Sequence, residues 1–328
     1  MSQFKPEAGM SAACLLFIPL LAAAASAQQP PDIPAQPPIA RPAYEQNAGP
    51  VIAIDEAHKN THTYGQGSQG LVRLLQRDGY RVRPFVEAIS RRSLEGIDVL
   101  VIAQPGMWDG PDASLNDAEV GALVEWVRAG GSLLLMLGHM PAPSSAAKLT
   151  AALGVRNWHD GYAMVQVSDS LVGRIIFSQR QHVREGEPDV IRTGPAGTRG
   201  VPSYQGADAV LSKHPIVEGR GPDESVRRVM TFVGSSFQAP DGAEALLVMP
   251  QRATSVMPEN PDSSAAWRRA PRVPVGGWVQ GAVMPFRKGR VALFGETALF
   301  SGQWPVHPAA SENYKLILNV MHWLTRIQ

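Results

Sequence analysis

The stretch VIAIDEAH, from Val51 to His58, decides the fold of this chain of 328 residues. Its first four residues are apolar at every position, which is typical of a strand buried on both faces of a sheet. A helical pattern with Leu71, Leu74 and Leu75 on one side follows, and Gly79 is placed to end that helix. A buried strand that leads into an amphipathic helix favours a layered α/β fold with parallel strands.

The same alternation continues along the chain. The pattern predicts strands within residues 80–85, 97–106 and 132–141, and helices within 68–79, 115–131 and 144–154. Residues 155–210 lose the regularity and indicate a loop-rich insertion. Further strands are expected within residues 226–237, 243–250, 276–286 and 290–295, with a hairpin turn at RKG between the last two and an amphipathic helix over 311–328.

The first 49 residues have the character of a leader and a spacer. Residues 1–27 contain an apolar run that ends at Ala25-Ser26-Ala27, the small-residue pattern of a cleavable signal peptide. Residues 28–49 are proline-rich and predict an extended linker. We therefore expect a periplasmic or secreted protein, exported through a Sec-type signal and without a stable membrane anchor.

Charge and cysteine content exclude several classes of function. The chain has 30 basic and 29 acidic side chains, so no basic excess points to a nucleic-acid partner. Cys14 is the only cysteine and lies inside the predicted signal peptide. After cleavage the chain would have no disulfide, no cysteine-bound zinc and no cysteine nucleophile.

Two motifs that resemble nucleotide sites fail on their context. DEAH at Asp55–His58 matches a box of helicase ATPases, but the chain contains no G-x-x-x-x-G-K-[ST] phosphate loop. GQGSQG at Gly65–Gly70 fits G-x-G-x-x-G, yet about ten residues separate it from the strand that should precede it directly. It is read as a structural turn or as a helix start able to hold an anion. The serine-hydrolase pattern G-x-S-x-G is absent as well.

Polar residues follow the ends of several predicted strands. In an open parallel sheet the carboxyl ends of the strands meet at one edge, where ligands bind. We call this the carboxyl edge. The candidate ligand-binding residues there are Asp55, Glu56, His58, Asn60, His62, Gln104, His139 and Glu296.

Three interpretations of this set stay open. The carboxylates and imidazoles can bind a polar ligand, they can hydrogen-bond loop backbone as purely structural groups, or they can perform metal-assisted or acid–base chemistry. No cofactor is predicted, but a divalent metal is left open, with His58, His62 and His139 as its candidate ligands.

Five segments together resemble a known family: VIAIDEAHKNTH, GGSLLLMLGHMP, KHPIVEG, GRVALFGETALFSGQ and NYKLILNVMHWL. The chain resembles an exported family of unknown function in the class I glutamine amidotransferase-like superfamily. Relatives of that family include ThuA-like proteins and auxiliary domains of gliding-motility ABC transporters. The resemblance implies a flavodoxin-like three-layer α/β sandwich over residues 50–328, with a mostly parallel sheet and the insertion at about 155–210.

The resemblance also implies where catalysis would occur. Catalytic members carry a cysteine nucleophile at a strand-to-helix elbow, and the similar turn here reads Gly138-His139-Met140-Pro141. Glutamine amidotransfer by that mechanism is therefore excluded. We expect a non-catalytic domain that binds a small polar, carbohydrate-like ligand or a cell-envelope protein. The alternatives are a metal-assisted hydrolase of envelope glycans or peptides, and an interaction module that uses the insertion.

Overall fold

A computed structural model describes residues 37–111, 114–167, 170–179, 190–191, 203–302 and 310–327. The predicted signal peptide, residues 1–27, and the start of the predicted linker lie outside these ranges. Within the described residues, no helix combines the length and the apolar character that crossing a membrane requires.

The central sheet contains a parallel part of the predicted kind. Its strands are β1 (Val51–Asp55), β2 (Arg81–Phe85), β3 (Val99–Ala103), β4 (Ser132–Met136) and β17 (Gly289–Phe294). Their order is β2-β1-β3-β4-β17, and every neighbouring pair is parallel. This is the 2-1-3-4-5 order of flavodoxin-like folds. All five residues of β3 and of β4 are buried, as the apolar sequence of β3 and the apolar run Leu133–Met136 of β4 predict.

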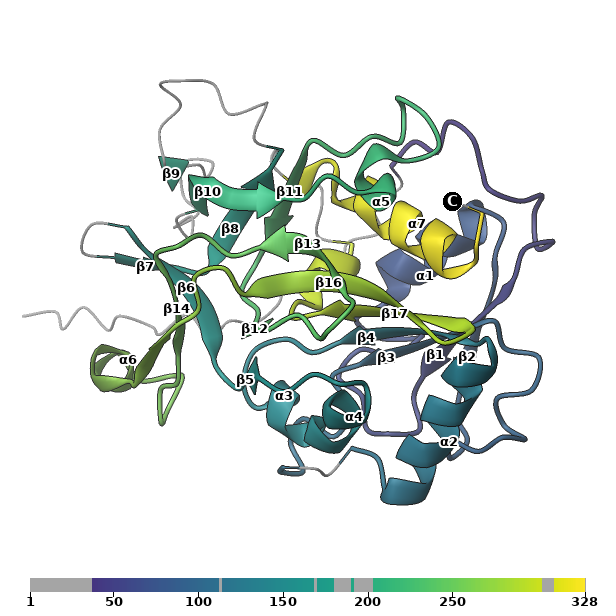
Figure 1. The fold of residues 1–328 in the computed structure, drawn as a ribbon, viewed down its shortest axis with the longest axis horizontal. Helices are drawn as coiled ribbons and strands as arrows, with labels where there is room; N and C mark the ends of the chain where they lie inside the picture. Colours follow the sequence, from purple (N-terminus) through teal and green to yellow (C-terminus); the bar gives the residue numbers. More distant parts are fainter. Residues whose placement is uncertain are drawn as a thin grey trace, which may run out of the picture.

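Helices cover both faces of this part of the sheet (Figure 1). One face carries α1 (Gln69–Arg77) and α7 (Asn313–Leu324), which share an apolar cluster with Ile52 and Ile54 of β1. The other face carries α2 (Asp117–Ala129), α3 (Ala142–Ser145) and α4 (Ala147–Ala152), which share a second cluster with Ala53. Alternate residues of β1 therefore enter opposite layers, and the fold is the expected three-layer α/β sandwich.

Beyond β17 the sheet continues with mainly antiparallel pairing. β17 forms a hairpin with β16 (Val279–Phe286), and the turn lies at the predicted RKG, where Arg287 has φ 58°. The order β11-β8-β10-β13-β16 extends the sheet with β13 (Glu244–Val248), β10 (Ser203–Leu211), β8 (Arg174–Ser178) and β11 (Arg228–Thr231). The short strands β5 (Trp158–His159), β9 (Val190–Ile191) and β12 (Ser236–Phe237) also pair in this sheet.

A second sheet has the order β15-β14-β6-β7. It consists of β15 (Arg272–Pro274), β14 (Ala253–Val256), β6 (Tyr162–Val167) and β7 (Ser170–Val172). The remaining short elements are α5 (Pro215–Glu218), α6 (Ser264–Arg269) and η2 (Ala298–Phe300). The described part of the predicted insertion thus supplies strands to both sheets, while residues 180–189 and 192–202 lie outside the description.

The second half of the predicted linker lies on the folded body. We call residues 37–49 the arm. Its Ala43 N–H donates to Asp78 Oδ1 at 2.9 Å, and its Tyr44 N–H donates to the Asp78 carbonyl at 3.1 Å. The Tyr44 ring meets Tyr80 edge-on, with ring centroids 5.1 Å apart. These contacts fix the described half of the proline-rich segment in place.

Candidate functional site

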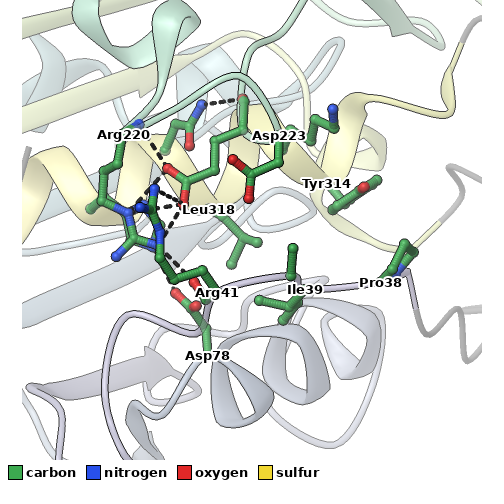
Figure 2. Close-up of a pocket in the computed structure, with 13 residues that line it drawn as sticks. Pro38, Ile39, Arg41, Asp78, Arg220, Asp223, Tyr314 and Leu318 are labelled. Carbon is green, nitrogen blue, oxygen red and sulfur yellow. Dashed lines mark hydrogen bonds and ion pairs between the residues drawn. The ribbon is translucent and has the colours of Figure 1, made fainter.

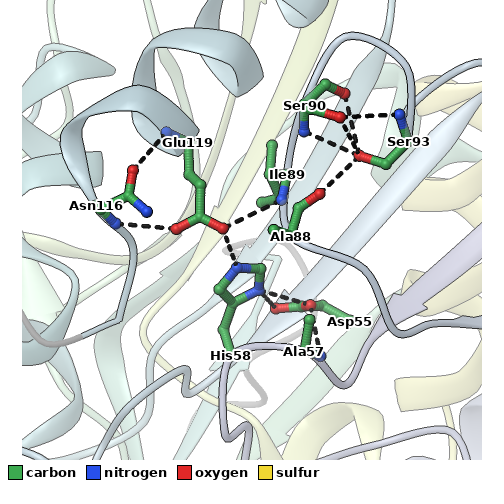
Figure 3. Close-up of polar contacts among 9 residues, drawn as sticks. All are labelled: Asp55, Ala57, His58, Ala88, Ile89, Ser90, Ser93, Asn116 and Glu119. Atoms are coloured by element: carbon green, nitrogen blue, oxygen red, sulfur yellow. Dashed lines mark hydrogen bonds and ion pairs between the residues drawn. The ribbon is translucent and has the colours of Figure 1, made fainter.

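His58 links two carboxylates at the carboxyl edge. Its Nδ1 lies 2.8 Å from Asp55 Oδ1, and its Nε2 lies 3.0 Å from Glu119 Oε1 (Figure 3). β1 positions Asp55, and the following turn brings His58 back over it. Glu119 comes from the first turn of α2, where it also accepts the N–H groups of Asn116 and Ile89 at 3.1 and 3.2 Å.

The two carboxylates hold His58 in the charged form. Burial alone would lower the pKa of this histidine, but the hydrogen bonds and charges of Asp55 and Glu119 raise it to about 9. An imidazolium that donates from both nitrogens has no lone pair to offer a metal ion. This trio therefore fastens the loop after β1 to the start of α2.

His62 has the opposite environment. It is 5% exposed, and burial lowers its pKa to about 4 against an opposing effect of the Gln104 side chain. Its Nδ1 lies 3.1 Å from Thr61 Oγ1, and the Thr61 hydroxyl in turn donates to Gln104 Oε1. Because that hydroxyl proton is used, Thr61 accepts from His62 Nδ1–H. Nε2 of the neutral ring is then an acceptor, and it is buried without a partner.

Asn60 leaves a second acceptor unpartnered in the same loop. Its amide nitrogen donates to the Ala103 carbonyl at the end of β3, at 3.3 Å, while its Oδ1 is buried and has no partner. The ends of β1, β3 and β4 meet here, since a Cβ on Gly138 would collide with the Gln104 amide. Asn60, His62 and Gln104 thus come together as predicted, and the loop after β1 presents two buried acceptors.

His139 belongs to an aromatic group beside this loop. Its ring stacks on Tyr162 of β6 with centroids 4.4 Å apart, and Tyr162 contacts Trp267 of α6 at 4.8 Å. His139 Nδ1 donates to the Met140 carbonyl at 2.8 Å. Burial lowers the pKa of His139, with weaker opposing effects from Met140 and Asp160, so the ring favours the neutral form.

The two remaining candidates hydrogen-bond backbone. Glu296, which follows β17, accepts the N–H groups of Phe232 and Ala298 at 2.9 and 2.8 Å. Burial raises the pKa of Glu296, and its backbone hydrogen bonds oppose that rise only in part. Glu56 accepts the Gly65 N–H at 3.4 Å. Glu296 is a buried structural carboxyl group, and it lies apart from the His58 trio.

The GQGSQG segment forms a turn before α1. Thr63 and Gln66 exchange backbone hydrogen bonds, and Gly67 has φ 76°. A Cβ on Gly67 would come 2.8 Å from the His62 ring, so a glycine is needed for this close approach. The motif thus packs His62 into the loop after β1.

The candidate metal ligands His58, His62 and His139 do not assemble into one centre. In the ranges that the structure describes, no group of three or more histidine, cysteine, aspartate or glutamate side chains is placed to hold a metal ion. His58 is bound on both sides, and His139 uses Nδ1 on backbone.

Sequence reasoning missed four residues of this edge: Thr61, Glu119, Tyr162 and Trp267. Glu119 carried a signal, since Asn116 and Glu119 predict a capping box, but that motif does not identify His58 as the second partner. Tyr162 and Trp267 come from the second sheet and α6, and no local pattern connects them to His139.

The comparisons with known proteins concern the fold. No family model and no curated protein matches the sequence. The structure is similar to the mmIFT52 N-terminal domain, with a TM-score of 0.55, 16% identity, and coverage of 84% of this chain and 97% of that one. It is also similar, at a TM-score of 0.40 and 11% identity, to a ThuA-like protein from Bacteroides uniformis, covering 89% of this chain and 95% of that one.

A third similar structure is a GMP synthase subunit from Thermoplasma acidophilum. Its TM-score is 0.40 and its identity 11%, over 84% of this chain and 94% of that one. At such identities the likeness concerns the fold alone. The expected flavodoxin-like α/β fold is confirmed by the parallel order β2-β1-β3-β4-β17, whereas the assignment to the exported family stays a prediction.

Proposed function

We propose that the protein is an exported, non-catalytic domain with a glutamine amidotransferase-like fold that binds a small, carbohydrate-like ligand at the carboxyl edge. The observation that carries the proposal is the pair of buried, unpartnered acceptors in the loop after β1, Asn60 Oδ1 and His62 Nε2. Buried polar atoms without a partner are rare and costly, so a ligand that satisfies them gains affinity.

The chemistry of the pair selects the ligand class. Both atoms are acceptors, and the low pKa of His62, about 4, keeps its ring uncharged at neutral pH. Hydroxyl groups are suitable partners because they donate without bringing a charge. The His139 ring stacks on buried Tyr162, and Trp267, which contacts Tyr162, is only partly buried and offers an apolar surface. Hydroxyls with an adjacent apolar face describe a sugar.

The turn after β4 supports the non-catalytic part of the proposal. In the resembled superfamily a cysteine nucleophile occupies this elbow, and here Gly138 and His139 stand in its place. The His139 ring is committed to Met140 and Tyr162.

A thermal-shift screen with mono- and oligosaccharides tests the proposal. At least one saccharide should raise the melting temperature of the native chain and fail to raise that of His62→Phe. His159→Phe is the matched control, because His159 lies on β5 and bonds Ser255 instead of the loop after β1. If no saccharide shifts melting, or if His62→Phe responds like the native chain, the binding proposal is wrong.

An envelope protein is the second candidate ligand, and two exposed apolar side chains favour it. Trp108, in the loop after β3, is 75% exposed, and Val86, directly after β2, is 67% exposed. Exposed tryptophans are enriched at binding hot spots. The test compares which envelope proteins the native chain and Trp108→Ala capture. If both capture the same protein, this candidate is removed. If Trp108→Ala loses the captured protein while its melting temperature is unchanged, the candidate is supported.

A further inference from the structure

A cavity of about 270 Å³ lies between the arm, α7 and residues 220–224 (Figure 2). Pro38, Ile39 and Arg41 of the arm form one wall, and Tyr314 and Leu318 of α7 form another. We call it the arm cavity. Asp78, which also lines it, directly precedes Gly79 and β2. The cavity is thus near the amino ends of the parallel strands, whereas His62 lies at their carboxyl ends.

Two residues that line the arm cavity have a buried polar atom without a partner. Asn319 is 0% exposed, and its amide nitrogen donates to the carbonyls of Ile216 and Glu224 at 2.7 and 3.0 Å. Both of its N–H groups are therefore used, and Oδ1 remains as an unpartnered acceptor.

The second such residue is His322, one helical turn further along α7. It is 1% exposed, and its Nε2 lies 2.7 Å from Asp78 Oδ2. The Nε2–H donates to that carboxylate, and Nδ1 is buried without a partner. Residues three apart lie on one face of a helix, so both unpartnered atoms lie in the same region.

The cavity lining contains charges of both signs. Its carboxylates are Asp78, Asp223 and Glu224, and its basic side chains are Arg41, Arg220 and Lys315 together with the imidazole of His322. Arg220 and Glu224 neutralise each other through hydrogen bonds of 2.6 to 3.0 Å. A cationic or anionic ligand would meet a like charge on this lining, whereas an uncharged one would not.

We infer that the arm cavity binds a small uncharged polyol of about monosaccharide size. Its hydroxyls, which can both donate and accept, hydrogen-bond to Asn319 Oδ1 and His322 Nδ1, and its C–H face lies against Tyr314, Leu318 and Ile39. The volume far exceeds that of one water, whose share of the liquid is about 30 Å³. Because the arm supplies one wall, the bound polyol also holds the arm to α7. This site is separate from the one at the carboxyl edge.

The histidine side-chain nitrogens provide a direct measurement. The full ¹⁵N-labelled chain is titrated with D-glucose and myo-inositol as polyols, and with putrescine and phosphate as charged probes. Two-bond ¹H–¹⁵N spectra follow His322 Nδ1, assigned by the signal missing from His322→Gln. We expect a saturable shift of that nitrogen with at least one polyol and none with either charged probe.

Two tryptophan variants locate the response. Ile39→Trp fills the cavity from the arm and should abolish the His322 shift. Val86→Trp is the matched control, because it adds the same ring at a 67% exposed position outside the cavity, and it should keep the shift. His62→Phe should also keep it, which separates this site from the carboxyl edge.

Several outcomes would overturn the inference. They are the absence of any polyol response at His322, a response to putrescine or phosphate instead, and an undiminished response in a folded Ile39→Trp chain. A shift that grows linearly with polyol concentration would indicate that only water occupies the cavity, and it would overturn the inference as well.

Discussion

His58 donates from both ring nitrogens to carboxylates, whereas His62, four residues later, is buried with one nitrogen unpartnered. Their pKa values differ accordingly, at about 9 and about 4. A raised histidine pKa stabilises the fold on the acid side of that value. A lowered one costs stability as the pH falls below the ordinary 6.5. The loop after β1 therefore contains two histidines with opposite pH dependence.

Replacing His58 with glutamine should remove a stabilisation that depends on pH. The folded pKa of about 9 exceeds the ordinary 6.5, so the contribution is complete below about pH 6.5 and disappears as the pH rises through 9. At about 1.4 kcal/mol for each pKa unit, the variant should be less stable by roughly 3 kcal/mol at pH 6. Urea unfolding between pH 6 and 9.5 should show that the difference in unfolding free energy between the native chain and the variant decreases as the pH rises.

His159→Gln is the control for that series. Burial lowers the pKa of His159, with a smaller opposing effect from Asp160. The difference in unfolding free energy between the native chain and His159→Gln should therefore stay constant between pH 6.5 and 9. If the difference in unfolding free energy between the native chain and His58→Gln stays constant across the pH series, the charge of the imidazolium contributes nothing to stability.

α2 shows what local patterns predict at the scale of an element. Asn116 and Glu119 predict a capping box, and both of its hydrogen bonds are present, at 3.0 and 3.1 Å. The pattern has no information on the other Glu119 oxygen, which bonds His58, 61 residues away in sequence. Local spacing encodes the cap, whereas the His58 contact exists only once the sheet has formed. The sequence therefore identified candidate residues by their positions at strand ends, but it could not identify the residues they contact.

Asn116→Ala tests the cap. Loss of the side-chain acceptor leaves the Glu119 N–H without its partner, and such replacements cost about 1 kcal/mol. Urea unfolding at pH 7 should show that decrease. Glu125→Ala on the same helix is the control, because its ion pair with Arg128 is largely exposed and contributes little. Equal losses in the two variants would contradict a specific capping role.

Gly121→Ala should act in the opposite direction. Gly121 lies in the interior of α2, and a Cβ there would meet no atom within 4 Å. Alanine restricts the unfolded chain and favours the helix, which should stabilise the protein by about 0.5–1 kcal/mol. The same urea series measures it. Gly289→Ala is the contrasting variant, since its Cβ would lie 2.0 Å from the Val127 carbonyl oxygen and should destabilise. A loss at Gly121 would contradict the prediction.

At the scale of the whole molecule, the parallel strands were predictable and the extension of the sheet was not. Apolar runs separated by helices predicted that β1 to β4 pair in parallel, and with β17 these strands lie in the order β2-β1-β3-β4-β17. The strands β13 and β16 were each expected, but an apolar run does not name its partner. β8 and β10 lie in a segment whose glycines and prolines indicate loops, and their pairing rests on contacts distant in sequence.

The arm is another part of the fold that local patterns do not predict. Its proline content predicts a spacer, whereas its other residues make specific contacts with the body. Asp78 accepts two N–H groups from the arm, and Tyr44 covers Tyr80, which is 0% exposed. Removing the arm would expose that ring and leave Asp78 with fewer donors. Two hydrogen bonds at about 1 kcal/mol each and the burial of one aromatic ring amount to roughly 2–4 kcal/mol.

We therefore expect a chain that begins at residue 50 to be less stable by roughly 2–4 kcal/mol than one that begins at residue 28. Urea unfolding of both chains at pH 7 measures the difference. Tyr44→Ala in the longer chain should reproduce the part of the loss that comes from the ring. A chain that begins at residue 37 is the matched control, since it keeps every contact described for the arm, from the Pro37 carbonyl onward. Equal stability with and without residues 37–49 would mean that the arm rests on the body without stabilising it.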